Sequence, residues 1–390
     1  KASRFPEHTT AVILAAVVLM AGCASTPDWP DTTPRSAESA SSATLLESVP
    51  FYPQEKYQCG PASLAMMLNA QGLETNPDIL KELVYLPGKE GSLQVEMVAG
   101  ARAHDMLVYR LEPEPEAILA EVEAGNPVLV MQNLRLSWWP QWHFAVVVGY
   151  DSTEQVFILN TDTRRHYEMP YKVFYNTWSK AERWAAVILP PDQTPASAEM
   201  LPYLQAAHDL ETTGHTLAAQ RAYQTAITRW PEQPTPLMAN ANLQYQLGHF
   251  QNAVGSFLRV VEKFPGFSEG WNNLAIALND AGCPARARQA SECAAGLAPK
   301  RFKPLQDETR SHAADAATCP QIPACRTYAQ EQATTAIFSV AQRLTRAAQD
   351  RSHNAGPASG MSAHGRTPHG WDRADSASYR NGHRPSGSKS

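Results

Sequence analysis

The chain has 390 residues, of which 43% are hydrophobic, and a formal net charge of −5 at pH 7. This length suffices for two domains plus tails, and the composition suffices for a sizeable core. The mildly acidic balance, without a basic stripe of interleaved aromatic residues, excludes nucleic acid as an expected partner. No pair of Cys or His residues has zinc-site spacing beside another such pair, so we expect no metal and no cofactor.

A signal peptide is predicted over residues 1–22. A short positive region precedes an apolar run of ten residues, 11–20, which is too short for a membrane-spanning helix of about 20 residues. The run leads into Leu-Met-Ala-Gly-Cys at 19–23, which resembles the lipobox of bacterial lipoproteins. The resemblance implies that Cys23 carries a lipid and, because alanine follows it, an outer-membrane anchor. An ordinary signal peptide with a chance cysteine is the alternative.

Cys59 heads the segment that carries the chemistry. It lies in Gln-Cys-Gly-Pro-Ala at 58–62, and Gln54 precedes it by five residues. The apolar spacing after it predicts a helix that ends near Gly72. A thiol at a helix N-terminus meets unpaired N–H groups and the helix dipole, which favour the thiolate. Because the thiolate is the nucleophile of cysteine hydrolases, this position suits peptide-bond cleavage.

Short elements follow in chain order. The patterns predict helices at 78–86, from 91–93 to about 101, and at 116–124, with strands at 106–109 and 128–131. His143 then opens an apolar strand that ends in Gly-Tyr, and a turn leads into a strand at 156–160. In a hairpin centred on residues 153 and 154, strand parity lets His143, Asn160 and Asp162 share one face near one end.

Three segments in this order resemble papain-like cysteine peptidases, and more closely the bacteriocin-processing (double-glycine leader) peptidase family. They are Gln54 with Cys59-Gly60, the strand His-Phe-Ala-Val-Val-Val-Gly-Tyr at 143–150, and Asn160 at the end of the next strand. The stretch 169–178 looks like the closing helix of that family. The resemblance implies an α+β papain-like domain over about 48–192.

The resemblance also implies roles for the site residues. Cys59 attacks the carbonyl carbon, His143 moves the proton, and Gln54 with the Cys59 backbone N–H holds the oxyanion. The third member orients the imidazole, and two residues compete for it. Asn160 matches the spacing from the histidine, whereas Asp162 carries the charge that the family usually has. The family often shows Asp-Pro where this chain has Asn-Thr-Asp.

Three tryptophans stand just before His143, and two interpretations of them remain open. Trp138, Trp139 and Trp142 either line a substrate cleft or cap the core.

A 34-residue period marks the region 197–301. Gly214, Gly248 and Gly282 keep this step (248−214 and 282−248), and proline and alanine positions keep it as well. Small residues, a glycine in mid-repeat and a terminal proline resemble the tetratricopeptide repeat, an all-α solenoid. Three such repeats would offer a concave face to a protein partner or serve as a spacer beside the first domain.

The remaining segments are assigned by composition. Residues 23–47 are rich in Ser, Thr, Pro and Ala and are predicted to form a flexible tether. Residues 302–350 form a partly helical extension with a helix at 327–349, and 351–390, without Leu, Ile or Val, form a disordered tail. In an oxidising periplasm either Cys319 pairs with Cys325 or Cys283 pairs with Cys293.

The sequence thus predicts a lipid-anchored protein of the bacterial cell envelope that faces the periplasm. It hydrolyses a peptide or related amide bond by a Cys-His-Asn/Asp mechanism, and its repeats bind a protein partner or substrate. One alternative is a catalytically degenerate peptidase fold that serves as an envelope protein-binding scaffold. Another is an acyl transferase or amidase that uses the same thiol.

Overall fold

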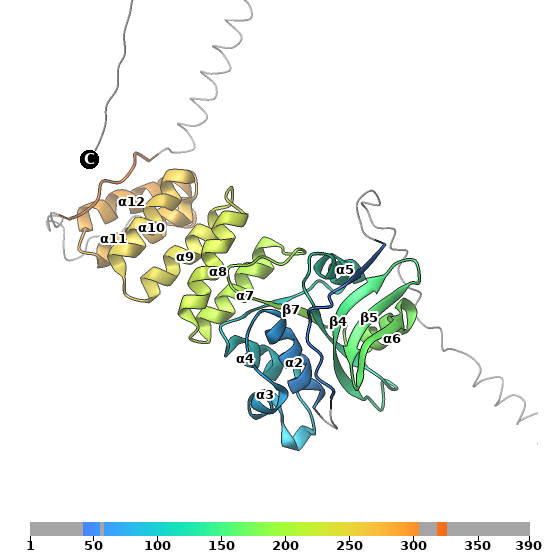
Figure 1. The fold of residues 1–390 in the computed structure, drawn as a ribbon. Helices are drawn as coiled ribbons and strands as arrows, with labels where there is room; N and C mark the ends of the chain where they lie inside the picture. The colour runs from blue at the N-terminus through green and yellow to red at the C-terminus, as the bar shows by residue number, and fades with distance from the viewer. Residues whose placement is uncertain (1–41, 55–57, 304–317, 326–390) are drawn as a thin grey trace, which may run out of the picture. The chain divides into compact units, whose positions relative to one another are not determined.

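A computed structural model describes residues 42–54, 58–303 and 318–325 (Figure 1). The signal peptide, Cys23, the helix expected at 327–349 and the tail 351–390 lie outside these residues. Within the described part of the chain, no helix is long and apolar enough to cross a membrane.

One antiparallel sheet of seven strands organises the N-terminal half. Its order is β2-β7-β3-β4-β5-β6, and β1 pairs with β4 beside this path. The strands are β1 Ala43–Leu45, β2 Leu107–Arg110, β3 Val128–Asn133, β4 Trp142–Asp151, β5 Val156–Thr161, β6 Arg164–Pro170 and β7 Ala185–Leu189. Each is joined to its neighbours by antiparallel pairing.

Helices cover both faces of this sheet and divide the core in two. The helices are α2 Cys59–Ala70, α3 Pro77–Val84, α4 Gln94–Arg102, α5 Pro115–Glu123 and α6 Tyr171–Ser179, with a short 3₁₀ turn at Pro87–Lys89. Val146 and Val148 of β4 pack with buried residues of α2, α3 and α4, whereas Ala145 and Val147 pack with residues of α5 and α6. This alternation is what a strand buried on both faces produces.

The stretch predicted to be tether, 23–47, in fact ends in a strand. β1 pairs with Gly149, Tyr150 and Asp151 of β4. The neighbouring strand β3 pairs with β4 only as far as Val147. Beyond that residue, β1 takes the place of β3 as the neighbour on the same edge of β4. Gly149 permits this approach, because a Cβ there would lie 2.5 Å from the Thr44 carbonyl oxygen.

A β-bulge changes the register of the hairpin β4–β5. Gly149 pairs with Ile158, but Val147 pairs with Leu159, so Val148 is an extra residue on β4. Because side chains alternate with a period of two, one inserted residue exchanges the faces of everything beyond it. The side chains that meet at the far end of the hairpin are therefore not those that an unbroken register predicts.

In the described part of the chain, six helices, α7 to α12, follow the sheet. They are α7 Met200–Thr212, α8 Thr216–Arg229, α9 Pro234–Gln246, α10 Phe250–Lys263, α11 Ser268–Asp280 and α12 Pro284–Leu297. First and last residues of alternate helices differ by 34, as in 200, 234 and 268. The glycine before each second helix has a positive φ, 88°, 75° and 81° at Gly214, Gly248 and Gly282, which suits a helix C-terminus. The period read from sequence therefore matches paired helices, while their assignment to the tetratricopeptide class stays a prediction.

Buried polar contacts fix the connection between the sheet and α7. Glu121 on α5 is fully buried, and its carboxylate accepts hydrogen bonds from the Ser197 N–H at 2.8 Å, the Ser197 hydroxyl at 2.6 Å and the Ala196 N–H at 3.2 Å. Arg102 also bonds Asp209 of α7 at 2.6 Å. A buried carboxylate with several donors is stable only while the donors stay in place, so the connection is tightly held.

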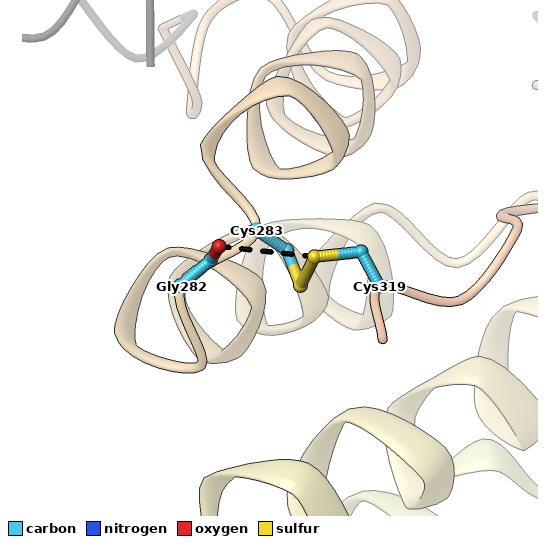
Figure 2. Close-up of a disulfide and its surroundings, with 3 residues drawn as sticks. All are labelled: Gly282, Cys283 and Cys319. Atoms are coloured by element: carbon cyan, nitrogen blue, oxygen red, sulfur yellow. Dashed lines mark hydrogen bonds between the residues drawn. A yellow bond between two sulfur atoms is a disulfide. The ribbon is translucent and has the colours of Figure 1, made fainter. Parts of the chain in front are cut away.

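Two disulfides hold residues 318–325 against the last helix pair. Cys283 pairs with Cys319 and Cys293 with Cys325, and Figure 2 shows the first bridge beside Gly282. Both pairings expected from sequence are wrong. Cys283 caps α12 and Cys293 lies within it, so ten residues of helix at about 1.5 Å each separate them by far more than a disulfide can bridge.

Candidate active site

Cys59 is the first residue of α2, as the sequence predicts. It is partly buried, and it is the one free cysteine among the described residues. Gly60 beside it packs against Ser92, since a Cβ at this position would lie 2.1 Å from the Ser92 Oγ. The glycine of the Cys-Gly pair therefore lets the start of the helix approach the loop that precedes α4.

The charge state of Cys59 differs from the expectation. Burial raises the pKa of the thiol, although hydrogen bonding from the backbone of Phe144, Gly60 and Cys59 itself acts in the opposite direction. Desolvation disfavours the charged form, and here it outweighs the helix N-terminus. The backbone N–H groups at the start of α2 favour the thiolate, as the sequence predicts, but burial has the larger effect and the net pKa is raised.

His143 is the second residue of β4, directly before Phe144. Its Nε2 lies 2.7 Å from the Oγ1 of Thr161, the last residue of β5. The pKa of His143 is lowered to about 4, chiefly by burial; the charge of Asp162 raises it and that of Arg164 lowers it further. The imidazole is therefore neutral at pH 7.

Gln54 lies between the start of β4 and the end of β5. Its backbone N–H donates to the Asp162 carbonyl at 2.9 Å. Its side chain is 6% exposed, and its Nε2 makes long contacts of 3.4 Å to the Ser63 Oγ and 3.5 Å to the Phe144 carbonyl. Hydrogen bonds this long are weak, so the amide N–H groups remain available to a stronger acceptor.

The two candidates for the third role occupy different places. Asn160 of β5 pairs with Val146 of β4. Val146 lies three residues after His143, and side chains an odd number of residues apart on a strand point to opposite faces. The expectation that Asn160 shares the face of His143 is therefore wrong. Its Oδ1 accepts from the His166 N–H at 3.1 Å, and no hydrogen bond to His143 occurs among the described residues. Asp162 is exposed in a turn with φ of 53° and acts on His143 through its charge.

The backbone of Phe144 connects the two principal residues. It lowers the pKa of the Cys59 thiol, against the larger effect of burial, and it follows His143 in the chain. Within the described residues no hydrogen bond joins the Cys59 sulfur to His143 directly. Thr161 and Ser63 are the members of this cluster that sequence reasoning missed, and the sequence carries no signal for Thr161 because its placement depends on the bulge at Val148.

The tryptophans before His143 do not cap the core. Trp138, Trp139 and Trp142 are 76%, 64% and 48% exposed. A cavity of about 440 Å³ opens beside them and is lined by Leu134, Arg135, Leu136, Trp139 and Lys180. The exposure contradicts the interpretation that these side chains cap the core, and the interpretation that they line a substrate cleft stays a prediction. Across the described residues, no group of three or more His, Cys, Asp or Glu side chains could hold a metal ion.

Residues 46–186 match the Peptidase_C39 like family, and in the structure this part of the chain is an α+β domain built on the antiparallel sheet. A C39-like peptidase from Bacillus anthracis is 17% identical, with a TM-score of 0.33, over 39% of this chain and 98% of that one. The double glycine motif protease of an AMS/PCAT transporter, in complex with its leader peptide, is 18% identical, with a TM-score of 0.28, over 36% and 90%. The peptidase domain of Streptococcus ComA, a bi-functional ABC transporter of a quorum sensing pathway, is 21% identical, with a TM-score of 0.31, over 36% and 98%. Among curated proteins, none matches the chain.

Proposed function

We propose that the chain is a cysteine peptidase that hydrolyses a peptide bond through Cys59. The observation that carries the proposal is the arrangement of the thiol at the start of α2, against the backbone of the residue that follows His143. The match of residues 46–186 to the Peptidase_C39 like family supports a peptide as the substrate. A related amide or thioester would use the same thiol, but no contact in the site favours it.

The reaction begins from a neutral pair, because burial raises the pKa of Cys59 and lowers that of His143 to about 4. His143 takes the thiol proton as the sulfur attacks the carbonyl carbon, so proton transfer and attack occur together. The oxyanion that forms accepts hydrogen bonds from the Cys59 backbone N–H and the Gln54 Nε2. Donors of this kind are worth about 3 kcal/mol of barrier each.

The second half of the reaction returns the site to its starting state. The imidazolium of His143 gives its proton to the amine as the C–N bond breaks, which leaves a thioester on Cys59. A water molecule, deprotonated by His143, then attacks the thioester and releases the carboxylic acid and the thiol. The negative charge of Asp162 stabilises the imidazolium during both steps, and we assign it the electrostatic part of the third role in preference to Asn160.

The proposal places this reaction on a lipid-anchored protein of the bacterial envelope. The lipobox-like run before Cys23 supports an outer-membrane anchor, and the two disulfides of the helical region support an oxidising compartment such as the periplasm. The helix pairs that recur every 34 residues support a tetratricopeptide-like stack that binds a protein partner or the substrate.

The test is cleavage of a proteome-derived peptide library by the purified chain, read by mass spectrometry of the new termini. The matched control is Cys59→Ser, which differs by one atom at the reacting centre. We expect cleavages that disappear in Cys59→Ser and that Gln54→Ala slows by about 100-fold, the cost of one oxyanion donor. Cleavage that persists in Cys59→Ser, or none at all alongside no labelling of Cys59 by a peptidyl vinyl sulfone, would reject the proposal.

A further inference from the structure

Thr161 is the side chain that the fold brings to His143. Val147 pairs with Leu159 across the β4–β5 hairpin. His143 lies four residues before Val147, and Thr161 lies two residues after Leu159, so both side chains project from the same face. The bulge at Val148 produces this pairing, because without it the even-numbered residues of β5 would occupy that face.

The contact is short and protected from water. The Thr161 Oγ1 lies 2.7 Å from the His143 Nε2, and Thr161 is 3% exposed. A β-branched side chain within a strand is restricted to few χ1 rotamers. The strand therefore fixes the hydroxyl in place, and water does not compete with it for the hydrogen bond to the imidazole.

The direction of this hydrogen bond decides what His143 can do. A neutral imidazole carries one proton, on either Nδ1 or Nε2. If the hydroxyl donated to Nε2, the proton would lie on Nδ1, and neither nitrogen could accept the thiol proton. If Nε2–H donates to the hydroxyl, Nδ1 keeps its lone pair.

We propose that Thr161 is a positioning residue: its Oγ1 accepts the Nε2–H of His143 and thereby fixes the tautomer in which Nδ1 keeps its lone pair and can accept a proton. The consequence for catalysis rests on the proposed function, whereas the hydrogen bond itself does not. The third role is thus divided, since a neutral hydroxyl orients the ring while Asp162, which is exposed in the next turn, supplies charge from a distance.

The test is the tautomer of His143 in the full chain at pH 7, read from long-range ¹H–¹⁵N correlations of ¹⁵N-histidine protein. The signal of His143 is assigned by its loss in His143→Gln. The variants are Thr161→Val, which keeps the shape and removes the hydroxyl, and Thr161→Ser, which keeps the hydroxyl. Thr163→Val, an exposed residue in the turn after β5, is the matched control.

We expect the Nε2–H tautomer in the wild type, in Thr161→Ser and in Thr163→Val. In Thr161→Val we expect a mixture of both tautomers and a rate of Cys59-dependent peptide cleavage lower by about tenfold, the cost of one lost hydrogen bond. An Nδ1–H tautomer in the wild type, or a tautomer that Thr161→Val leaves unchanged, would overturn the inference.

The tautomer measurement and the cleavage measurement test the two proposals separately. If the tautomer depends on the Thr161 hydroxyl but no cleavage depends on Cys59, the positioning contact stands and the peptidase proposal falls. If cleavage depends on Cys59 while the tautomer ignores Thr161, the peptidase proposal stands and the positioning role falls.

Discussion

The resting charge of Cys59 gives the sharpest prediction, because it sets how the thiol reacts with an alkylating agent as pH changes. Burial raises the pKa of the Cys59 thiol above its ordinary 9.0, so less than about 1% is thiolate at pH 7. With His143 neutral above pH 4, no imidazolium is present to hold a thiolate. The rate of alkylation by iodoacetamide should therefore rise about tenfold per pH unit between pH 6 and 8, without a plateau.

The assay follows carbamidomethylation of the peptide that contains Cys59 by mass spectrometry, under non-reducing conditions that keep the two disulfides closed. Glutathione serves as the reference thiol and Cys59→Ser as the blank. His143→Gln should keep the rise of about tenfold per pH unit, since the imidazole contributes no charge to the resting state. A rate that is constant from pH 6 to 8, and that falls in His143→Gln, would refute the reasoning and restore a thiolate–imidazolium pair.

Two further predictions concern stability. The pKa of His143 is about 4 in the folded protein against 6.5 unfolded, so the unfolded state binds the extra proton between these values and stability falls as pH drops from 6.5 to 4. The loss is at most about 3 kcal/mol, because the side chain keeps some contact with water. In urea unfolding, the wild type should lose this much stability relative to His143→Gln as pH falls from 6.5 to 4, and parallel curves would contradict the prediction. Gly60→Ala should lower the free energy of unfolding by about 1–3 kcal/mol, because the new methyl group meets Ser92. The double variant with Ser92→Gly should recover part of that loss in the same unfolding assay, and no recovery would rule out this contact as the cause.

The repeated and amphipathic elements were predictable because their signals are local. A strict period of 34 residues located the helix pairs, and the apolar run after Cys59 located α2. The sequence analysis did not predict strands β1 and β6, because neither has the alternating apolar pattern that identifies a half-buried strand. β6 is mostly polar and charged, and β1 is three residues long inside a segment of low hydrophobicity. Their existence depends on edges of the sheet that only the assembled fold provides.

The position of the candidate site in the fold was predictable from the sequence, whereas the roles of its residues stay predictions. Gln54, Cys59 and His143 gather around the Phe144 backbone, and each is tied to a recognisable motif. The contact of Thr161 with His143 could not be predicted, because a one-residue bulge decides which face of β5 Thr161 occupies. The raised pKa of the Cys59 thiol could not be predicted either. Its desolvation depends on atoms from many elements, and it changes the pKa more than the helix N-terminus does.

The two disulfides interleave along the chain, since Cys283 reaches past Cys293 to Cys319, and Cys293 reaches past Cys319 to Cys325. A protease that cuts the chain between residues 304 and 317 would therefore release nothing. The nicked molecule would migrate as one band on a non-reducing gel and as two bands after reduction. A cut at this end of the helical region would therefore divide the backbone while the two pieces stay covalently joined through the disulfides.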